Sequence, residues 1–281
     1  MKNRIVTSAV ILLVALLVVI FSGYIVYPIA LALLAVIAVF EILRVIGVHK
    51  TLVLSVPAYL MAAGFPVSAY FVDADEVLVF LLALAAAMFV YLMWLMGVSV
   101  FSKGKIPFSK IAEVFSAVTY VAVSFTSLSI LRYLDRNIGV FCVILVFVIS
   151  WVCDVFAFAV GSLIGKHKLI PEVSPKKTVE GAIGGIVFSA LLCLAYGLVI
   201  DLFFENIQVN YLYLFLFGAI LSVVSQLGDL VASLIKREYG VKDYGSIFPG
   251  HCGVMDRFDS VLAVSTIILI LSIVFPPFIA Q

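Results

Sequence analysis

Long apolar runs are the feature of this sequence that most restricts its fold. A helix of about 20 predominantly apolar residues crosses the roughly 30 Å core of a bilayer. Hydrophobic residues make up 65% of the chain and charged residues 12%, against about 45–50% and about 25% in soluble domains. The sequence therefore predicts an all-α, polytopic membrane bundle of about nine transmembrane helices. The expected spans cover residues 5–22, 25–47, 51–72, 77–98, 111–133, 137–163, 179–203, 211–235 and 258–277.

The first of these runs follows a short basic start and has the length of a signal-peptide core. No small-residue cleavage pattern follows it, and further spans come directly after it, so we expect a retained first span.

Basic residues are distributed unevenly between the two ends of these spans. With the N-terminus in the cytoplasm, only Arg132 and Arg136 of the 17 lysines and arginines fall on the outer side. Cytoplasmic segments of membrane proteins carry such an excess of basic residues. We therefore expect an integral protein of the inner (cytoplasmic) cell membrane, with Arg132 as an outer-face residue that alanine can replace. The net charge of +1 gives no reason to expect a nucleic-acid partner, and none is predicted.

Two parts of the chain receive different roles in this interpretation. Residues 1–135, with about five spans, are predicted to be a scaffold that gives lipids access. Residues 136–281 are predicted to be the catalytic part. Its two basic segments, 164–178 and 239–257, are expected to face the cytoplasm, where nucleotides are found.

Two aspartates lie well inside apolar runs, Asp154 in the sixth and Asp229 in the eighth. A carboxylate in the bilayer costs about 2.5–3.5 kcal/mol, so each one requires a reason. Taken singly, an interhelical hydrogen bond or a buried ion pair explains either of them. Helical spacing puts each on a face of small or polar residues: Asp154 with Ser150, Ala157 and Gly161, and Asp229 with Ser225, Ser233 and Lys236. By contrast, Glu41 and Glu113 lie near span ends, where snorkelling or a basic neighbour satisfies a carboxylate, and they are expected to be structural.

The segment between the last two spans cannot be regular structure, because three glycines and a Pro-Gly pair interrupt it. It ends at Asp256 and Asp259, at the entrance of the last span. Asp256 alone is also a candidate helix cap. Together with the intramembrane aspartates and the basic residues nearby, these two carboxylates predict a site for a divalent metal and phosphates.

Three stretches resemble one known family, the phosphatidate cytidylyltransferases, also called CDP-diacylglycerol synthases. The longest reads Ser233-x-Ile235-Lys236-Arg237-x4-Lys242-Asp243-x-Gly245-x2-Phe248-Pro249-x-His251-x-Gly253-x2-Asp256-Arg257-x-Asp259. The second runs from Ser174 to Gly181 with the sequence SPKKTVEG, and the third is Asp154 with Ala157. The match covers about residues 140 to 262, and the first 130 residues agree only in being spans.

The resemblance implies transfer of a cytidylyl group from CTP to phosphatidate, giving CDP-diacylglycerol and pyrophosphate for phospholipid biosynthesis. It implies Mg²⁺ as cofactor and leaves a second cation open. CTP, phosphatidate and membrane lipids are the expected partners, and a homodimer is left open. The implied metal ligands are Asp229, Asp256 and Asp259. The implied catalytic residues are Lys177, Lys236, Arg237, Lys242, His251 and Arg257. The implied substrate-binding residues are Ser174, Lys176, Lys177, Glu180, Asp154, Asp243 and Gly253.

Two positions depart from the family pattern. Cys252 stands where the family usually has glycine, and Phe158 stands where it often has tyrosine. Neither change removes a charged group, so the assignment is kept. Three alternatives stay open: a cytidylyltransferase for an isoprenoid glycerol-ether phosphate, a lipid kinase, and a proton-coupled transporter. The transporter is disfavoured because the acids cluster toward the cytoplasmic half and no inverted repeat is visible.

Overall fold

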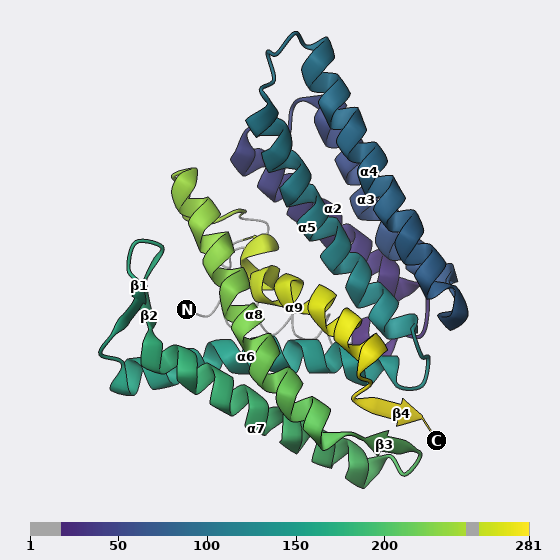
Figure 1. Ribbon diagram of the computed structural model, residues 1–281, viewed down its shortest axis with the longest axis vertical. Coiled ribbons are helices and arrows are strands. Elements are labelled where there is room, and N and C mark those ends of the chain that lie inside the picture. The colour runs from purple at the N-terminus through teal and green to yellow at the C-terminus, as the bar shows by residue number, and fades with distance from the viewer. Residues whose placement is uncertain (1–17, 246–252, 281) are drawn as a thin grey trace, which may run out of the picture. The chain divides into compact units, whose positions relative to one another are not determined.

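The computed structural model describes residues 18–245 and 253–280. Within these ranges, eight helices are long and apolar enough to cross a membrane (Figure 1). The all-α, polytopic class predicted from the sequence is confirmed. Most of the first expected span, residues 5–22, lies outside the described residues. Of its described part, residues 18–22, only 18–20 are helical.

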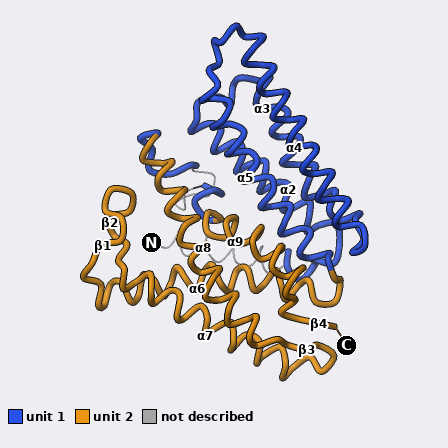
Figure 2. The backbone as a smooth tube through the Cα atoms, viewed as in Figure 1, with its two compact units in different colours: residues 1–134, 239–257 blue, residues 135–238, 258–281 orange. Residues whose placement is uncertain are grey.

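The chain forms two compact units, shown in different colours in Figure 2. Unit 1 comprises Met1–Leu134 and Tyr239–Arg257, and unit 2 comprises Asp135–Glu238 and Phe258–Gln281. Segment 239–257 thus groups with the N-terminal helices. The functional division expected at residue 135 stays a prediction.

Four long helices make up most of unit 1: α2 (Val26–Ile46), α3 (Leu52–Ser68), α4 (Val77–Phe101) and α5 (Phe108–Tyr133). Two short 3-10 helices, η1 (Ala69–Phe71) and η2 (Ala74–Glu76), connect α3 to α4. Helix α5 packs against α2, α3 and α4, and its second half is buried on all sides. Helix α2 ends at Gly47, whose φ of 86° is the left-handed conformation that glycine adopts without strain.

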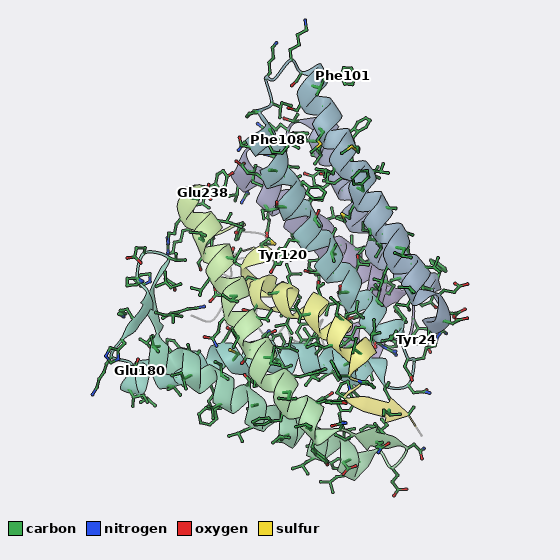
Figure 3. The ribbon with its side chains drawn as sticks, in the orientation of Figure 1. Tyr24, Phe101, Phe108, Tyr120, Glu180 and Glu238 are labelled. Carbon is green, nitrogen blue, oxygen red and sulfur yellow. The ribbon has the colours of Figure 1, made fainter. Side chains whose placement is uncertain are left out.

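The outer helices of unit 1 present apolar side chains to their surroundings. Figure 3 shows Phe101 and Phe108 at the facing ends of α4 and α5, and they are 87% and 65% exposed. A soluble protein would bury such residues, whereas lipid solvates them at no cost. The exposed apolar surface is therefore what a membrane-spanning unit requires.

The surroundings of Arg132 argue against the expectation that alanine can replace it, whereas its place on the outer side stays a prediction. This residue lies near the end of α5, where it is only 8% exposed, and its Nε donates a hydrogen bond of 2.8 Å to Ser22 Oγ. The neighbouring Tyr133 hydroxyl donates to the Ser22 carbonyl over 3.0 Å. The end of α5 packs against the segment that precedes α2, so a basic residue placed in an outer turn by sequence is buried by tertiary structure.

Unit 2 contains the helices α6 (Gly139–Ile164), α7 (Val179–Phe203), α8 (Tyr211–Glu238) and most of α9 (Met255–Val274). Helix α7 packs against both α6 and α8. The approach is close because glycines line the contacts: a Cβ added to Gly184 would lie 2.6 Å from the Val160 side chain, and one added to Gly218 would lie 2.6 Å from Ala190 Cα. At Gly161 an added Cβ would lie 2.7 Å from Thr178 Oγ1, so this end of α6 packs closely against the start of α7.

Two short antiparallel pairs of strands, which the sequence did not predict, complete unit 2. Strand β1 (Lys168–Ile170) pairs with β2 (Ser174–Thr178), and β3 (Ile207–Val209) pairs with β4 (Phe278–Ala280). The β1–β2 pair occupies the predicted loop 164–178 and leads directly into α7. Thr178 caps that helix, because its Oγ1 accepts the Gly181 N–H over 3.1 Å. The last residues of β2 are thereby fixed to the start of α7.

Candidate active site

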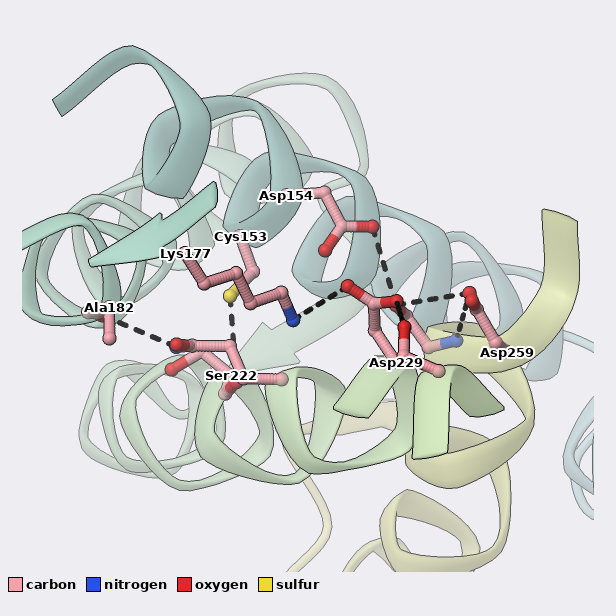
Figure 4. A network of polar contacts seen from close by, with 10 residues as sticks. Cys153, Asp154, Lys177, Ala182, Ser222, Asp229 and Asp259 are labelled. Atoms are coloured by element: carbon pink, nitrogen blue, oxygen red, sulfur yellow. Dashed lines mark hydrogen bonds and ion pairs between the residues drawn. The ribbon is translucent and has the colours of Figure 1, made fainter. Parts of the chain in front are cut away.

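Three aspartates and a lysine from four elements of unit 2 converge on one place, called the carboxylate cluster below. Its members are Asp154 of α6, Asp229 of α8, Asp259 of α9 and Lys177 of β2 (Figure 4). Lys177 Nζ lies 2.6 Å from Asp229 Oδ2. Ser260 Oγ donates to Asp154 Oδ2 over 3.3 Å and is 3.4 Å from Asp259 Oδ1. Residues that lie up to 106 positions apart in the chain thus share one polar network.

The structure separates the two lysines that the sequence placed together. Lys177 points toward Asp229 in Figure 4, whereas Lys176 is exposed. Neighbouring residues of a strand point to opposite sides, and both lysines lie in β2. Only Lys177 therefore belongs to the carboxylate cluster.

The cluster brings like charges together. Asp154, Asp229 and Asp259 interact electrostatically with one another, and Lys177 and Lys236 act on them with the opposite charge. Carboxylates at such close quarters repel one another, and a bound cation would relieve that repulsion.

The described part of the chain offers oxygen donors of the kind that Mg²⁺ prefers, although it does not form a complete cage. In the described part of the chain, no three His, Cys, Asp or Glu side chains lie close enough together to hold a metal ion. Mg²⁺ is usually held by one or two carboxylates together with water and substrate phosphates. Oxygen donors such as those of Asp229 and Asp259 meet that requirement once a phosphate completes the coordination.

Two polar residues that border the cluster were missed at the sequence level. Ser260 bridges two of the aspartates, and Gln226 donates from Nε2 to the Ala182 carbonyl over 3.2 Å, which ties α8 to α7. The signal that could have found them is spacing. Ser260 directly follows Asp259, and Gln226 lies three residues before Asp229, on the same helical face.

Glu180, in the first turn of α7, organises the segment before β1. Figure 3 shows it at the start of α7, beside the β1–β2 pair. Its carboxylate accepts the backbone N–H groups of Lys166 and His167 at 3.1–3.2 Å, and the His167 ring nitrogen Nδ1 lies 2.6 Å away. These contacts close the loop that carries Lys177. The predicted role of Glu180 in substrate binding stays a prediction.

Asp256 belongs to unit 1, where it organises the chain around the start of α9. Its Oδ2 accepts the backbone N–H groups of Tyr244 over 2.8 Å and of Gly253 over 3.1 Å. A capping carboxylate stands before the helix and accepts an N–H two or three residues downstream, whereas Asp256 lies in the first turn of α9 and these two donors lie upstream. The contacts are therefore not those of the helix cap considered from the sequence. A carboxylate has further lone pairs, so these bonds are compatible with metal binding, which stays a prediction.

The other predicted residues are spread along the same segments. Lys236 and Arg237 lie in the last turn of α8, the first half-buried and the second exposed. His251 and Cys252 lie outside the described residues. Among the remaining residues, three are exposed: Lys242, Asp243 and Arg257. Ser174 is half-buried in β2, and Gly253 is buried.

Comparison with known proteins agrees with this arrangement. Residues 2–275 match the sequence profile of the cytidylyltransferase family. The chain belongs to this family. The match includes the N-terminal helices, for which the motifs carried no signal, and it confirms the resemblance drawn from residues 140 to 262.

Relatives in the family align along nearly the whole chain. A protein of Staphylococcus epidermidis is 37% identical over 275 residues, which are 97% of this chain and 99% of that protein. One of Bacillus subtilis is 36% identical over 269 residues, 94% of each chain. One of Staphylococcus aureus is 36% identical over 275 residues, 97% of this chain and 99% of that protein. All three bear the name phosphatidate cytidylyltransferase.

Proposed function

We propose that this protein transfers a cytidylyl group from CTP to phosphatidate, releasing pyrophosphate and leaving CDP-diacylglycerol in the membrane. The observation that carries the proposal is the similarity, along 94–99% of their length, to relatives named for this activity. The carboxylate cluster supports it, because its residue types suit a reaction between two phosphate groups. The eight apolar helices of the described residues suit a lipid substrate and a lipid product.

The reaction needs no nucleophile from the protein. The phosphate monoester of phosphatidate is largely dianionic near neutral pH, since the second pKa of such a group is about 6. One of its oxygens attacks the α-phosphorus of CTP, a new P–O bond forms, and the bond to the β-phosphate breaks, with pyrophosphate carrying away the electron pair. The obstacle is repulsion between the lipid phosphate and the triphosphate, so the protein must neutralise charge and align the two groups.

Lys177 and Asp229 are suited to this task because each has its charge in place before substrate arrives. Without substrate they neutralise each other across 2.6 Å. When substrate binds, a phosphate can replace Asp229 as the partner of Lys177, and a cation can replace Lys177 as the partner of Asp229. The ion pair then separates, and each side chain still has a partner of opposite charge. Lys236, which acts on Asp259, adds positive charge at the end of α8. Asp154 and Ser260 keep the Asp259 carboxylate oriented.

Mg²⁺ is the proposed cofactor, with Asp229, Asp256 and Asp259 as its proposed ligands. When bound, it would screen the charge of the triphosphate and act as a Lewis acid. Lys177, Lys236, Arg237 and Lys242 are the proposed phosphate contacts. We further propose that these residues face the cytoplasm, which the one-sided distribution of basic residues supports.

The test uses detergent-purified protein, labelled CTP, Mg²⁺ and phosphatidate, with extraction of the lipid-soluble product. Radiolabel in CDP-diacylglycerol, lost on addition of a chelator and in the Asp229→Asn variant, is the expected result. The same incubation with an isoprenoid glycerol-ether phosphate measures lipid preference, and a product formed only there would overturn the choice of phosphatidate. Absence of any nucleotide transfer, together with proton-driven flux in liposomes, would favour a transporter.

A further inference from the structure

Glu41, near the end of α2, is a fully buried carboxylate in the half of the chain expected to be scaffold. Its exposed fraction is 0%, so of the two expectations for it, snorkelling and a basic neighbour, snorkelling is excluded. Oε2 accepts the backbone N–H of Met255 over 2.9 Å, across 214 residues of sequence. Oε1 has no hydrogen-bond partner among the described residues. The Val254 backbone and the charge of Arg44 also favour the carboxylate. One buried oxygen is still left without a partner, which is costly and which packing alone does not explain.

The Glu41 carboxylate lies against both ends of the glycine-rich segment. A Cβ added to Gly253 would lie 2.5 Å from each of its oxygens, and a Cβ added to Gly245 would overlap Oε1. The same added Cβ of Gly245 would lie 3.0 Å from Gly253 Cα. The two chain ends therefore touch each other around Glu41. They are called the loop base below, comprising residues 244–245 and 253–255.

Arg44, almost one turn further along α2, binds the loop base at Tyr244. Its Nη2 donates a 2.6 Å hydrogen bond to the Tyr244 carbonyl. The Tyr244 side chain is fully buried, and its N–H donates to Asp256. Helix α2 thus binds one end of the loop base through the Arg44 guanidinium and the other end through the Glu41 carboxyl group.

A third anchor fixes the start of this segment to α5. The Tyr239 hydroxyl donates to Glu113 Oε2 over 2.5 Å, and Lys110 Nζ lies 2.6 Å from the same oxygen. The expectation that a basic neighbour satisfies Glu113 is confirmed. Burial and this hydrogen bond raise the pKa of Tyr239 above its ordinary value, so the hydroxyl stays protonated as a donor at neutral pH.

We propose that Glu41, together with Arg44, is a positioning residue that holds the loop base, and through it Asp256, in the geometry that the reaction needs. The inference rests on the proposed function. Helix α9 begins at Met255, and the first N–H groups of a helix lack intrahelical partners and favour a nearby anion. Glu41 supplies a carboxylate oxygen there from another helix. An apolar residue would fill the space but could not accept the Met255 N–H.

The kinetic test compares Glu41→Ala, Glu41→Gln and Arg44→Met with two controls on exposed residues, Glu76→Gln and Lys50→Met. Misplacement of reacting groups by about 1 Å can lower the reaction rate about 100-fold. We therefore expect kcat of the Glu41→Ala variant to fall about 10- to 100-fold. KM values for CTP and phosphatidate should change far less. Glutamine keeps an acceptor for the Met255 N–H and should recover part of kcat. Unchanged kcat per folded molecule in the alanine variant would overturn the inference.

A second measurement needs no turnover and so separates failure of this inference from failure of the proposed function. Hydrogen exchange followed by mass spectrometry reports opening of the backbone around Tyr244 and Met255. Faster exchange there in Glu41→Ala, with exchange in β3 and β4 unchanged, is the expected result. Exchange that rises uniformly, or not at all, would overturn the positioning role even if the enzyme is active.

A double variant checks the geometry itself. In the wild-type background Gly245→Ala places a methyl group against Glu41, and we expect it to reduce activity strongly. In the Glu41→Ala background that clash is removed, so the same substitution should cost much less. Additive losses would mean that the two side chains do not meet, which would overturn the proposed contact.

Discussion

Replacing Lys177 or Asp229 tests whether their ion pair has a function beyond folding. The two side chains are 23% and 28% exposed, between a fully buried pair and a surface pair. Removing one partner of a buried pair costs about 3–5 kcal/mol, whereas surface pairs contribute about 0–1 kcal/mol. We therefore expect Lys177→Met to lower the free energy of unfolding by about 1–3 kcal/mol.

The two single variants, Lys177→Met and Asp229→Asn, should differ in how much stability they lose. Lys177→Met leaves Asp229 beside Asp154 and Asp259 with one cation fewer. Asp229→Asn leaves Lys177 still attracted to Asp154 and removes one member of a crowded acidic group. Asp229→Asn should therefore destabilise less than Lys177→Met does, and the double variant should be more stable than the sum of the two losses predicts.

Activity should follow a different pattern from stability. In the proposed reaction each residue exchanges its partner for a ligand, so the double variant regains stability but not catalysis. Thermal unfolding in detergent and kcat/KM for CTP measure the two quantities, with Lys50→Met as the control on an exposed lysine. All three variants should lose more than about tenfold in kcat/KM, equivalent to about 1.4 kcal/mol. A double variant with wild-type activity would refute the reasoning, because the pair would then be purely structural.

Further outcomes are expected at four other positions. Asp256→Asn should leave less than about a tenth of the activity in a folded protein, whereas loss of a mere helix cap would cost about 1 kcal/mol of stability. Lys236→Ala should lower kcat/KM by more than about tenfold, measured beside the same Lys50 control; an effect equal to that control would rule out a phosphate contact. Gly161→Leu should prevent stable folding, seen as loss of a monodisperse peak in size-exclusion chromatography, because the space beside Thr178 admits no side chain. Cys252→Gly should be tolerated in the activity assay, and complete loss would mean that the thiol has a role of its own.

The sequence alone determined where the helices lie. The run predicted at residues 179–203 coincides with α7, and the run predicted at 25–47 differs from α2 by one residue at each end. This succeeds because the bilayer imposes a local requirement, a stretch of apolar residues long enough to cross it with every backbone group bonded internally. The sequence also identified the acidic and basic residues that carry the proposed chemistry, since a charge in an apolar run needs a reason wherever the helices pack.

Only the tertiary structure decided which of these charges meet. The strand geometry of β2 sends Lys177 to the carboxylate cluster and Lys176 away from it. Ser260 became a bridge because α6 and α9 bring Asp154 and Asp259 to the same hydroxyl. The physical reason is that apolarity acts on each segment separately, whereas a hydrogen bond or ion pair depends on which helix faces which. Glu41 shows this most clearly, because its partner Met255 lies 214 residues away, and no local pattern distinguishes a carboxylate that snorkels from one that holds a loop.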